Sequence, residues 1–385
     1  MKILMICNTD GALYVFRKPI IEAALSAGHD VVGISGESEY VERLRTLGVR
    51  MHIQEFSRHS VGLLKNLRLF LGLWRVIRIE KPDVVHGFTH KPAIYGTLAA
   101  RLAGVRRVLV TITGLGTLFI RDDLKSRILR RLLLWQYRFA LNYARCVFFQ
   151  NPDDLEQFTR LGLIEDDRAV LTHGSGLDLS DYPFPTEADC RLARQTIEHE
   201  LGENLDGRCL VLLPARGVRE KGFFEFYEAA RIINALEPQR YFFIHLGLID
   251  TASSKSLTAE GVNAFAQQCG VRYLGFKDDI IRYMRGSDIV ALPSYREGTP
   301  RSLIEALAMG KCIVTTDTPC CRETVLEGWN GWLCTVASSR SLAACVLRAD
   351  DTFIHTARAR SRALCEAKYD SRWLVDLTLR KYSDN

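Results

Sequence analysis

The sequence predicts an α/β protein of two doubly wound domains, each a parallel sheet with helices on both faces. In both halves of the chain, short runs rich in β-branched and aromatic residues alternate with longer runs at helical spacing. Parallel strands require crossover helices of this kind. With 385 residues, 47% of them apolar, the chain is long enough to bury two ordinary cores.

The expected strands can be placed one by one. In the first half they are Lys2–Cys7, Val31–Ile34, Met51–Ile53, Val84–His86, Val108–Thr111, Cys146–Gln150 and Ala169–Thr172. In the second half they are Cys209–Pro214, Tyr241–Leu246, Val271–Leu274, Ile289–Pro293, Lys311–Thr315 and Trp332–Cys334. Glycines and a proline interrupt the pattern between Gly174 and Pro183, so we place the two domains at residues 1–178 and 179–365.

Composition disfavours several classes of protein. No window holds the roughly 18 uninterrupted apolar residues of a membrane span, and Met1–Cys7 is typical of a first strand and not of a secretory signal, so we expect a cytoplasmic protein. The eleven cysteines lack paired C-x-x-C spacing, which supports neither a zinc site nor a disulfide framework. A dinucleotide oxidoreductase would need a Gly-x-Gly-x-x-Gly turn after the first strand, and Cys7–Gly11 does not supply one.

Positive charge is concentrated in one region of the chain. The net charge is +6, yet residues 58–145 alone hold 17 Lys and Arg against 4 Asp and Glu. Such an excess in one domain predicts an anionic partner. Nucleic acid is not expected, because no aromatic-and-basic module or zinc spacing accompanies the charge.

The stretch Glu297-Gly-Thr-Pro-Arg-Ser-Leu-Ile-Glu305 follows an expected strand and opens a helix. We expect Thr299 as the N-cap and Pro300 as the first helical residue, so that free backbone N–H groups point outward. Helix ends of this kind bind phosphate. Glu297 precedes the helix and Glu305 lies about five positions into it, so the two carboxylates flank a gap of diphosphate size, which suits a sugar nucleotide.

A second loop in the same half carries cations. Pro214–Gly222 leaves a strand and enters a helix with three cations in six positions, among them Arg216 and Lys221. These two can reach a diphosphate from the side opposite the other helix end, without a metal. The alternative for this loop is a solvated basic turn. For Glu297 and Glu305 the alternatives are solvated carboxylates at a helix end, or the acid and base of a glycoside hydrolase.

These stretches together resemble the retaining GT-B glycosyltransferases of family 4, over nearly the whole chain. The shared features are the Glu297 to Glu305 spacing, the Arg216–Gly222 loop, Gly328-Trp-Asn-Gly331 after an expected helix at Arg322–Leu326, and Asp83–Pro92 in the first half. The segments Thr111–Phe119 and Leu292–Glu297 are most similar to members that extend polyprenyl-diphosphate-linked glycans, of the capsule, O-antigen or N-glycan precursor type. The resemblance implies that Rossmann-like domains face each other across a cleft. The first would bind the acceptor and the second the nucleotide sugar, and the C-terminal helix at 366–385 would return to the first domain.

The resemblance also implies roles for individual residues. Glu305 would hold the ribose hydroxyls and Glu297 the donor sugar, while Arg216 and Lys221 would neutralise the leaving diphosphate with no divalent ion. His90 matches a histidine near the reacting centre. The residues expected to bind the donor are Gly11, Arg216, Lys221, Phe276, Thr299, Pro300, Arg301, Ser302, Leu303 and Glu305.

The chain departs from the family pattern in three places, one of which is Leu246-Gly-Leu-Ile-Asp250, where the family often has Gly-Asp-Gly. Asn8–Leu13 keeps only Gly11 where the family's first loop commonly has a glycine pair, so the role of this loop transfers less directly to single residues. Pro319-Cys-Cys-Arg322 stands where similar chains commonly have Pro-Gly-Cys-Arg.

Two expected helices carry much of the basic region. Arg127, Arg131, Arg138 and Arg145 recur at spacings of four, seven and seven, and Lys65, Arg68 and Arg75 fall near one face of the earlier run. Helices of this kind suit an acceptor-side face on an anionic membrane. They are equally compatible with ordinary sheet-covering helices whose outer faces are solvated.

We therefore expect a retaining, metal-independent hexosyl- or N-acetylhexosaminyltransferase, peripheral on the inner face of the plasma membrane. It would move a sugar from a nucleotide donor, preferably UDP-linked, to a polyprenyl-diphosphate-linked saccharide in bacterial surface-glycan assembly. It would need no cofactor beyond that co-substrate. The alternatives are a nucleotide-sugar epimerase of the same fold, a GDP-mannose-type transferase to another lipid or soluble acceptor, and a non-catalytic nucleotide-sugar binder.

Overall fold

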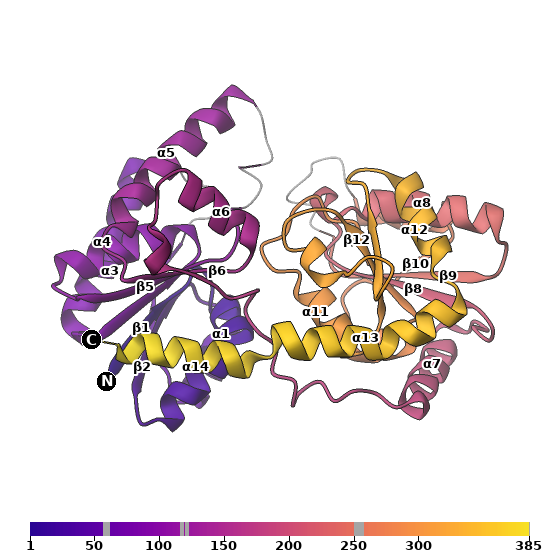
Figure 1. Cartoon of the computed structure of the whole chain (residues 1–385), viewed down its shortest axis with the longest axis horizontal. Helices are drawn as coiled ribbons and strands as arrows, with labels where there is room; N and C mark the ends of the chain where they lie inside the picture. The colour runs from indigo at the N-terminus through magenta and orange to yellow at the C-terminus, as the bar shows by residue number, and fades with distance from the viewer. Residues whose placement is uncertain (57–61, 116–118, 120–122, 250–257, 385) are drawn as a thin grey trace. The chain divides into compact units, whose positions relative to one another are not determined.

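The computed structural model of the chain describes residues 1–56, 62–115, 119, 123–249 and 258–384. These residues form two compact units (Figure 1). The first unit comprises Met1–Asp178 together with Asp370–Asn385, and the second comprises Leu179–Tyr369.

The first unit is built on a seven-stranded parallel sheet in the order β3-β2-β1-β4-β5-β6-β7. Its strands are β1 Lys2–Ile6, β2 Asp30–Ser35, β3 Arg50–Ile53, β4 Val84–Phe88, β5 Arg107–Ile112, β6 Cys146–Phe149 and β7 Ala169–Leu171. Its helices are α1 Asp10–Ser26, α2 Tyr40–Thr46, α3 Leu63–Glu80, a π-helical turn Pro92–Gly96, α4 Thr97–Leu102, α5 Leu124–Leu141, α6 Pro152–Arg160 and α14 Ser371–Ser383. The strand order reverses between β1 and β4, which makes their carboxyl ends the topological switch point of this sheet.

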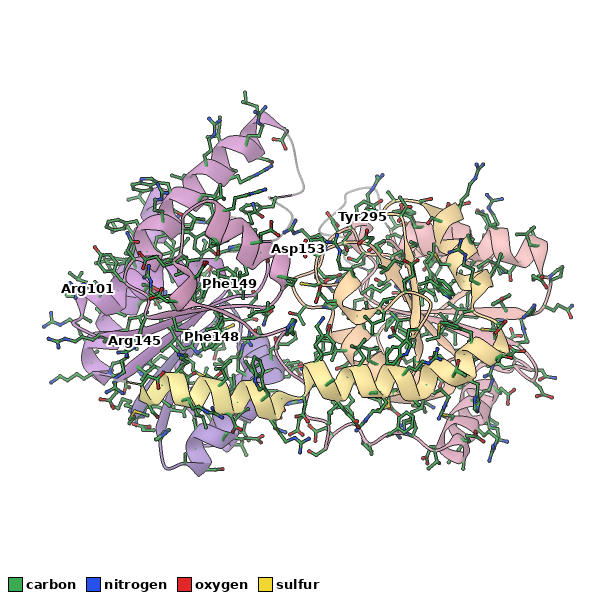
Figure 2. The ribbon with its side chains drawn as sticks, in the orientation of Figure 1. Arg101, Arg145, Phe148, Phe149, Asp153 and Tyr295 are labelled. Atoms are coloured by element: carbon green, nitrogen blue, oxygen red, sulfur yellow. The ribbon has the colours of Figure 1, made fainter. Side chains whose placement is uncertain are left out.

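Helices cover both faces of the first sheet, so neighbouring residues of one strand enter different cores. Phe148 and Phe149 are successive residues of β6 (labelled in Figure 2). Phe148 belongs to the core under α1, whereas Phe149 packs edge-on against Phe158 of α6, with ring centroids 5.2 Å apart. Leu374 of α14 joins the core under α1, so the C-terminal helix completes the first unit.

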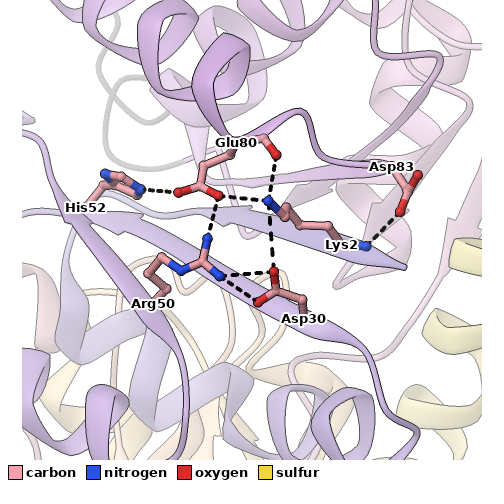
Figure 3. A network of polar contacts seen from close by, with 6 residues as sticks. All are labelled: Lys2, Asp30, Arg50, His52, Glu80 and Asp83. Atoms are coloured by element: carbon pink, nitrogen blue, oxygen red, sulfur yellow. Dashed lines mark hydrogen bonds and ion pairs between the residues drawn. The ribbon is translucent and has the colours of Figure 1, made fainter.

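The amino ends of the first strands are tied together by an ionic network (Figure 3). Glu80, the last residue of α3, accepts hydrogen bonds from Arg50 Nη1 at 2.7 Å and Lys2 Nζ at 3.1 Å. Its other carboxylate oxygen lies 2.7 Å from His52 Nε2. This network lies at the edge opposite the switch point, so it anchors α3 without entering the functional edge.

The second unit is built on a six-stranded parallel sheet in the order β10-β9-β8-β11-β12-β13. Its strands are β8 Cys209–Pro214, β9 Tyr241–Leu246, β10 Val271–Tyr273, β11 Ile289–Leu292, β12 Cys312–Thr316 and β13 Gly331–Cys334. Its helices are α7 Glu187–Leu201, α8 Phe223–Leu236, α9 Ala259–Gln268, α10 Ile280–Gly286, α11 Arg301–Ala308, α12 Ser339–Arg348 and α13 Asp351–Tyr369. The switch point lies between β8 and β11, and both strands are buried along their whole length.

The predicted fold class is confirmed, because all thirteen expected strands are present in two parallel sheets. One expected helix is wrong. Arg322–Leu326 forms only a short 3₁₀ turn over Arg322–Thr324, because Val325 takes an extended conformation with φ −129° and ψ 127°. Among the described helices, none is both long and apolar enough to cross a membrane.

Candidate active site

The four residues predicted to be catalytic all follow strands at the two switch points. His90 comes two residues after β4 in the first unit. In the second unit, Arg216 and Lys221 follow β8, and Glu297 follows β11. Because doubly wound sheets bind ligands at these positions, the topology supports the predicted loops as the functional edge of each unit.

The loops after β8 and β11 are in direct contact. Gly222 takes a left-handed conformation with φ 74°, and a Cβ there would lie 2.0 Å from the carbonyl oxygen of Pro293. No other residue type fits such an approach. The backbone N–H of Tyr295 (labelled in Figure 2) donates to the carbonyl oxygen of Glu220 at 2.8 Å, and Ser294 Oγ lies 2.9 Å from the same oxygen. The cationic loop is therefore held against the loop that carries Glu297.

Glu297 is fixed through one of its two carboxylate oxygens. Lys221 Nζ lies 2.5 Å and Ser294 Oγ 2.6 Å from Oε1. The carboxylate side chain is only 9% exposed. Within the described part of the chain Oε2 receives no hydrogen bond, so it is available to a ligand hydroxyl.

Glu305 is held in the same way in α11. Tyr182 Oη donates to Oε1 at 3.0 Å and Arg301 Nε donates at 2.8 Å. Burial, followed by the negative charge of Glu305, raises the pKa of Tyr182 to about 12, so its hydroxyl stays protonated and donating. Both hydrogen bonds go to Oε1, so Oε2 of Glu305 accepts no hydrogen bond from a described residue.

The predicted start of α11 is wrong by one residue. Pro300 is the cap residue, with φ −77° and ψ 77°, and the helix begins at Arg301. Arg301 donates its backbone N–H to Thr299 O at 2.9 Å, so the chain enters the helix through an inverse γ-turn instead of a Thr299 side-chain cap. Leu303 is fully buried and its backbone N–H donates to Pro300 O, so we no longer assign it to donor binding. Ser302 remains half-buried in the first turn.

Three other predicted donor residues differ in character: Arg216 and Phe276 lie in loops, whereas Gly11 is the second residue of α1. Arg216 is exposed directly after β8, and Phe276 is 62% exposed after β10. The backbone N–H of Gly11 donates to Asp10 Oδ1 at 2.9 Å. The first turn of α1 therefore uses this amide within the protein.

His90 is oriented by a buried tyrosine that the sequence did not reveal. Its Nδ1 lies 2.6 Å from the hydroxyl of Tyr137, a fully buried residue of α5. Burial lowers the pKa of His90 to about 4, so the imidazole is neutral near pH 7. With Nδ1 engaged by Tyr137, no described residue bonds to Nε2, which can meet a sugar hydroxyl.

Other contacts missed from the sequence also join residues far apart in the chain. Tyr182 reaches Glu305 across 123 positions, and His90 meets Tyr137 across 47. His245 Nε2 lies 2.9 Å from Ala215 O and thereby supports the start of the cationic loop. Each pair forms only because the strands bring the residues together, and no local spacing signals it.

A small basic pocket lies at the functional edge of the first unit. It has a volume of about 300 Å³, and its lining includes Lys65 and Arg68 of α3 together with Lys91 next to His90. Burial and then the charge of Lys65 lower the pKa of Lys91, as expected for cations held close together. An anion entering this pocket would relieve that repulsion.

The helix α5 carries an exposed apolar stripe beside its basic residues. The stripe comprises Leu124, Ile128, Leu132, Trp135 and Phe139, which are 72%, 58%, 45%, 65% and 50% exposed. Arg127, Arg131 and Arg138 are also exposed, although Arg138 donates to the carbonyl oxygens of Leu161 and Gly162. Arg145 (labelled in Figure 2) was wrongly placed in this helix, because α5 ends at Leu141 and Arg145 donates its backbone N–H to Val108 O.

A larger cavity of about 460 Å³ lies in the second unit but away from this chemistry. It is lined by Cys209 and Asp288, at the amino ends of β8 and β11, and by residues of α7 and α13. Because ligands of doubly wound sheets bind at the carboxyl ends, we do not assign this cavity to the active site.

Two protein-family models match the chain in succession. The glycosyl transferase 4-like domain matches residues 18–174, and the glycosyl transferases group 1 model matches residues 195–351. Together they cover most of both units. The order of the two models agrees with the resemblance drawn from the sequence motifs.

The chain is also similar to curated bacterial enzymes. It is 29% identical over 383 residues to the N,N'-diacetylbacillosaminyl-diphospho-undecaprenol alpha-1,3-N-acetylgalactosaminyltransferase of Campylobacter jejuni, covering 99% of this chain and 98% of that enzyme. It is 27% identical over 261 residues to the UDP-Gal:alpha-D-GlcNAc-diphosphoundecaprenol alpha-1,3-galactosyltransferase of Escherichia coli, covering 66% of this chain and 63% of that enzyme.

Solved structures show the same fold at lower identity. HepE of Anabaena in complex with UDP superposes with a TM-score of 0.78 at 18% identity, over the whole of both chains. Sucrose-phosphate synthase of Thermosynechococcus elongatus superposes with a TM-score of 0.80 at 17% identity, over 100% of this chain and 98% of that one. The chain belongs to the group 1, family 4 type of glycosyltransferases with the GT-B fold.

Proposed function

We propose that the protein transfers a sugar from a UDP-linked donor to a polyprenyl-diphosphate-linked saccharide in bacterial surface-glycan assembly, with retention at the anomeric carbon. The observation that carries this proposal is the paired arrangement of Glu297 and Lys221 beside Glu305 at the second switch point. Both relatives named above act on diphosphoundecaprenol-linked substrates, and the name of the second specifies UDP-galactose. These names support the acceptor class and the nucleotide.

In this proposal the second unit binds the donor. The free oxygen of Glu305 accepts the ribose hydroxyls, and that of Glu297 accepts hydroxyls of the sugar being moved. Lys221, which pairs with Glu297 in the structure, turns toward the diphosphate as negative charge develops on the leaving group. Arg216 lies on the same loop and adds a second cation. We propose that these charges replace a divalent ion.

In the first unit, neutral His90 contacts a hydroxyl group of the donor sugar or of the acceptor. It does so through Nε2, because Nδ1 is engaged by Tyr137. The pocket with Lys65 and Arg68 supplies positive charge for an anionic acceptor. These residues make the first unit the acceptor side.

We further propose that the protein works at the inner surface of the plasma membrane. The α5 stripe presents Trp135 and Phe139 next to exposed arginines. An amphipathic helix of this composition lies well in an anionic lipid interface. It would bring the first unit to an acceptor whose lipid remains in the bilayer.

The test is a transfer assay with UDP-hexoses and UDP-N-acetylhexosamines and a diphosphopolyprenyl saccharide acceptor. We expect product in the presence of EDTA. Lys221→Met should lower kcat about 100-fold or more, since it removes a charge that stabilises the leaving group. Glu305→Gln should mainly raise KM for the donor, because it weakens ribose contacts present before reaction.

The outcomes separate the candidate functions. An isomerised sugar nucleotide formed from donor alone would favour the epimerase. Donor binding without transfer to any acceptor would indicate a binding protein. Transfer from GDP-mannose and not from UDP-sugars would reject the nucleotide assignment, and full activity of Lys221→Met would reject the leaving-group role.

A further inference from the structure

Arg17 of α1 is a buried cation with no polar partner among the described residues. Arg17 is 4% exposed. Its Nε is buried and donates to no acceptor among the described residues. The guanidinium carbon lies 4.4 Å from the centre of the Phe88 ring. A single contact with a ring face offsets only part of the cost of removing a charge from water.

The groups around Arg17 are neutral, so none supplies the missing negative charge. Burial raises the pKa of the Cys7 thiol and of the Tyr382 hydroxyl, and it lowers that of His86 well below its usual value. Burial also lowers the pKa of Arg17 to about 10, which leaves it charged at pH 7. Arg17 therefore stands as an isolated positive charge in a region of low polarity.

The position of this charge is the switch point of the first sheet. Cys7 follows β1, and Phe88 is the last residue of β4. The strands β1 and β4 are paired directly. Two further polar atoms at these strand ends, Asn8 Oδ1 and Thr89 Oγ1, are buried and have no hydrogen-bond partner among the residues that the structure describes. The unsatisfied groups gather where a doubly wound sheet receives its ligand.

The N-terminus of α1 is already satisfied by the protein. Thr9 Oγ1 accepts from the backbone N–H of Ala12 at 3.2 Å, and Asp10 Oδ1 accepts from that of Gly11 at 2.9 Å. These caps use amides that a phosphate would otherwise approach. Arg17 is thus the group at this edge whose charge is left uncompensated within the described structure.

We propose that Arg17 binds a phosphate group of the lipid-linked acceptor's diphosphate. The proposal rests on the proposed function, because it assigns the ligand of the first unit to that acceptor. A guanidinium offers two parallel donors to phosphate oxygens, a geometry that the ammonium groups of Lys65 and Lys91 cannot provide.

The experiment measures binding of farnesyl diphosphate, a short prenyl diphosphate, to the full-length chain by calorimetry. Arg17→Met should weaken this binding at least tenfold, whereas UDP binding stays within twofold of wild type. Lys18→Met is the matched control, since Lys18 is the next residue of α1 and pairs with Glu22 on the surface. It should change neither affinity by more than twofold.

Thermal stability gives a second, independent readout. Without ligand, Arg17→Met should melt at or above the wild-type temperature, because the substitution removes a buried charge that lacks a partner. A guanidinium with a purely structural role would instead lower the melting temperature when removed. A lower melting temperature with unchanged farnesyl diphosphate affinity would overturn the proposal.

The remaining outcomes are also decisive. If Arg17→Met does not fold, Arg17→Lys decides: tenfold weaker farnesyl diphosphate binding supports the guanidinium fork, and wild-type affinity overturns it. Arg17-dependent binding of inorganic diphosphate with no gain from the prenyl chain would overturn the assignment to a lipid-linked ligand. Loss of UDP binding in Lys221→Met tests the donor site separately, so failure of the proposed function can be told apart from failure of this inference.

Discussion

At the scale of single residues, the pair of His90 and Tyr137 makes a sharp prediction. Tyr137→Phe removes the hydroxyl that engages Nδ1 at 2.6 Å and leaves the ring packing against Phe158 in place. The imidazole then loses its fixed tautomer and orientation, so we expect kcat to fall about tenfold while KM for the donor changes little. Steady-state kinetics with the transfer assay measures both constants.

The control for this substitution is another buried tyrosine with a similar hydrogen bond. Tyr283 is fully buried, and its hydroxyl donates to Glu200 Oε1 at 2.7 Å, away from the loops of the functional edge. Tyr283→Phe should lower stability by about 1 kcal/mol and leave kcat unchanged. Equal losses of kcat in the two variants would mean that Tyr137 acts only through stability.

Single residues also show which parts of the site could be predicted from the sequence and which could not. Glu297 and Glu305 could be found because their spacing is local to one loop and one helix. Tyr182, the partner of Glu305, could not be assigned, because a contact across 123 positions of the chain leaves no periodic signal. Cys320, in the place of a common glycine, takes φ 66°, and its thiol donates to Gly298 O, so the left-handed turn persists with a side chain that sequence rules disfavour.

At the scale of elements, α5 predicts how the protein meets a membrane. Substituting Trp135 and Phe139 together by Ser removes two aromatic side chains that are 65% and 50% exposed. Because these rings gain free energy by entering the lipid interface, the double variant should bind anionic vesicles at least tenfold more weakly. Co-sedimentation with phosphatidylglycerol-containing vesicles measures the effect.

A charge variant of α5 separates the electrostatic contribution to vesicle binding from the apolar one. Reversing Arg127 and Arg131 to Glu should abolish the preference for anionic over neutral vesicles, since both side chains are exposed. Leu192→Ser in α7 is a control, because it removes an apolar side chain that is 65% exposed in the second unit. Unchanged vesicle binding in both α5 variants would remove the membrane face from the proposal.

A second element-scale prediction concerns the end of α3. Burial alone would raise the pKa of Glu80, but hydrogen bonds from His52 and Lys2 and the charge of Arg50 lower it overall. Glu80→Gln should reduce the free energy of unfolding at pH 7 by about 1–2 kcal/mol, because it removes a buried negative charge that accepts hydrogen bonds from three partly exposed side chains. Chemical denaturation measures the difference.

The pH dependence of that difference follows from the sign of the shift. A carboxyl with a lowered pKa stabilises the folded state above its unfolded value of 4.5, and this contribution is lost as pH falls through the folded pKa. The gap between wild type and Glu80→Gln should therefore narrow below about pH 4.5. Glu42→Gln, at an exposed pair with Arg45, should show a much smaller gap at every pH. A gap for Glu80 that does not depend on pH would contradict the network.

Element boundaries show the same division between local and long-range information. Strands such as Cys209–Pro214 and Tyr241–Leu246 were predicted to the residue, because continuous burial gives an uninterrupted apolar run. The start of α11 was missed by one residue, since the γ-turn at Pro300 and a helical first turn share the same proline φ. The π-helical turn at Pro92–Gly96 leaves no comparable sequence signal.

At the scale of the whole molecule, each unit contains a neutral histidine that meets a buried tyrosine. His90 in the first unit and His245 in the second each have a pKa lowered to about 4 by burial. In both units the histidine meets a buried tyrosine hydroxyl, at 2.6 Å from Tyr137 and 2.7 Å from Tyr227. Both units thus contain the same uncharged histidine–tyrosine pair. His245 is fully buried with both ring nitrogens engaged, whereas His90 is partly exposed and leaves Nε2 for a ligand.

This arrangement predicts acid sensitivity well above the pKa of carboxylates. Between about pH 6.5 and 4 the unfolded chain binds protons at His90 and His245 that the folded chain excludes, so the free energy of unfolding falls as pH falls. Each histidine contributes at most about 1.4 kcal/mol per pH unit. His245→Gln should be less stable than wild type at pH 7.5 but should lose less stability on moving to pH 5, whereas His355→Gln, at an exposed position, should follow the wild-type curve. Melting temperatures at pH 7.5, 6 and 5 measure how stability changes with pH in each variant. If the melting temperatures of wild type and His245→Gln fall in parallel, the buried imidazole does not govern the acid response of the second unit.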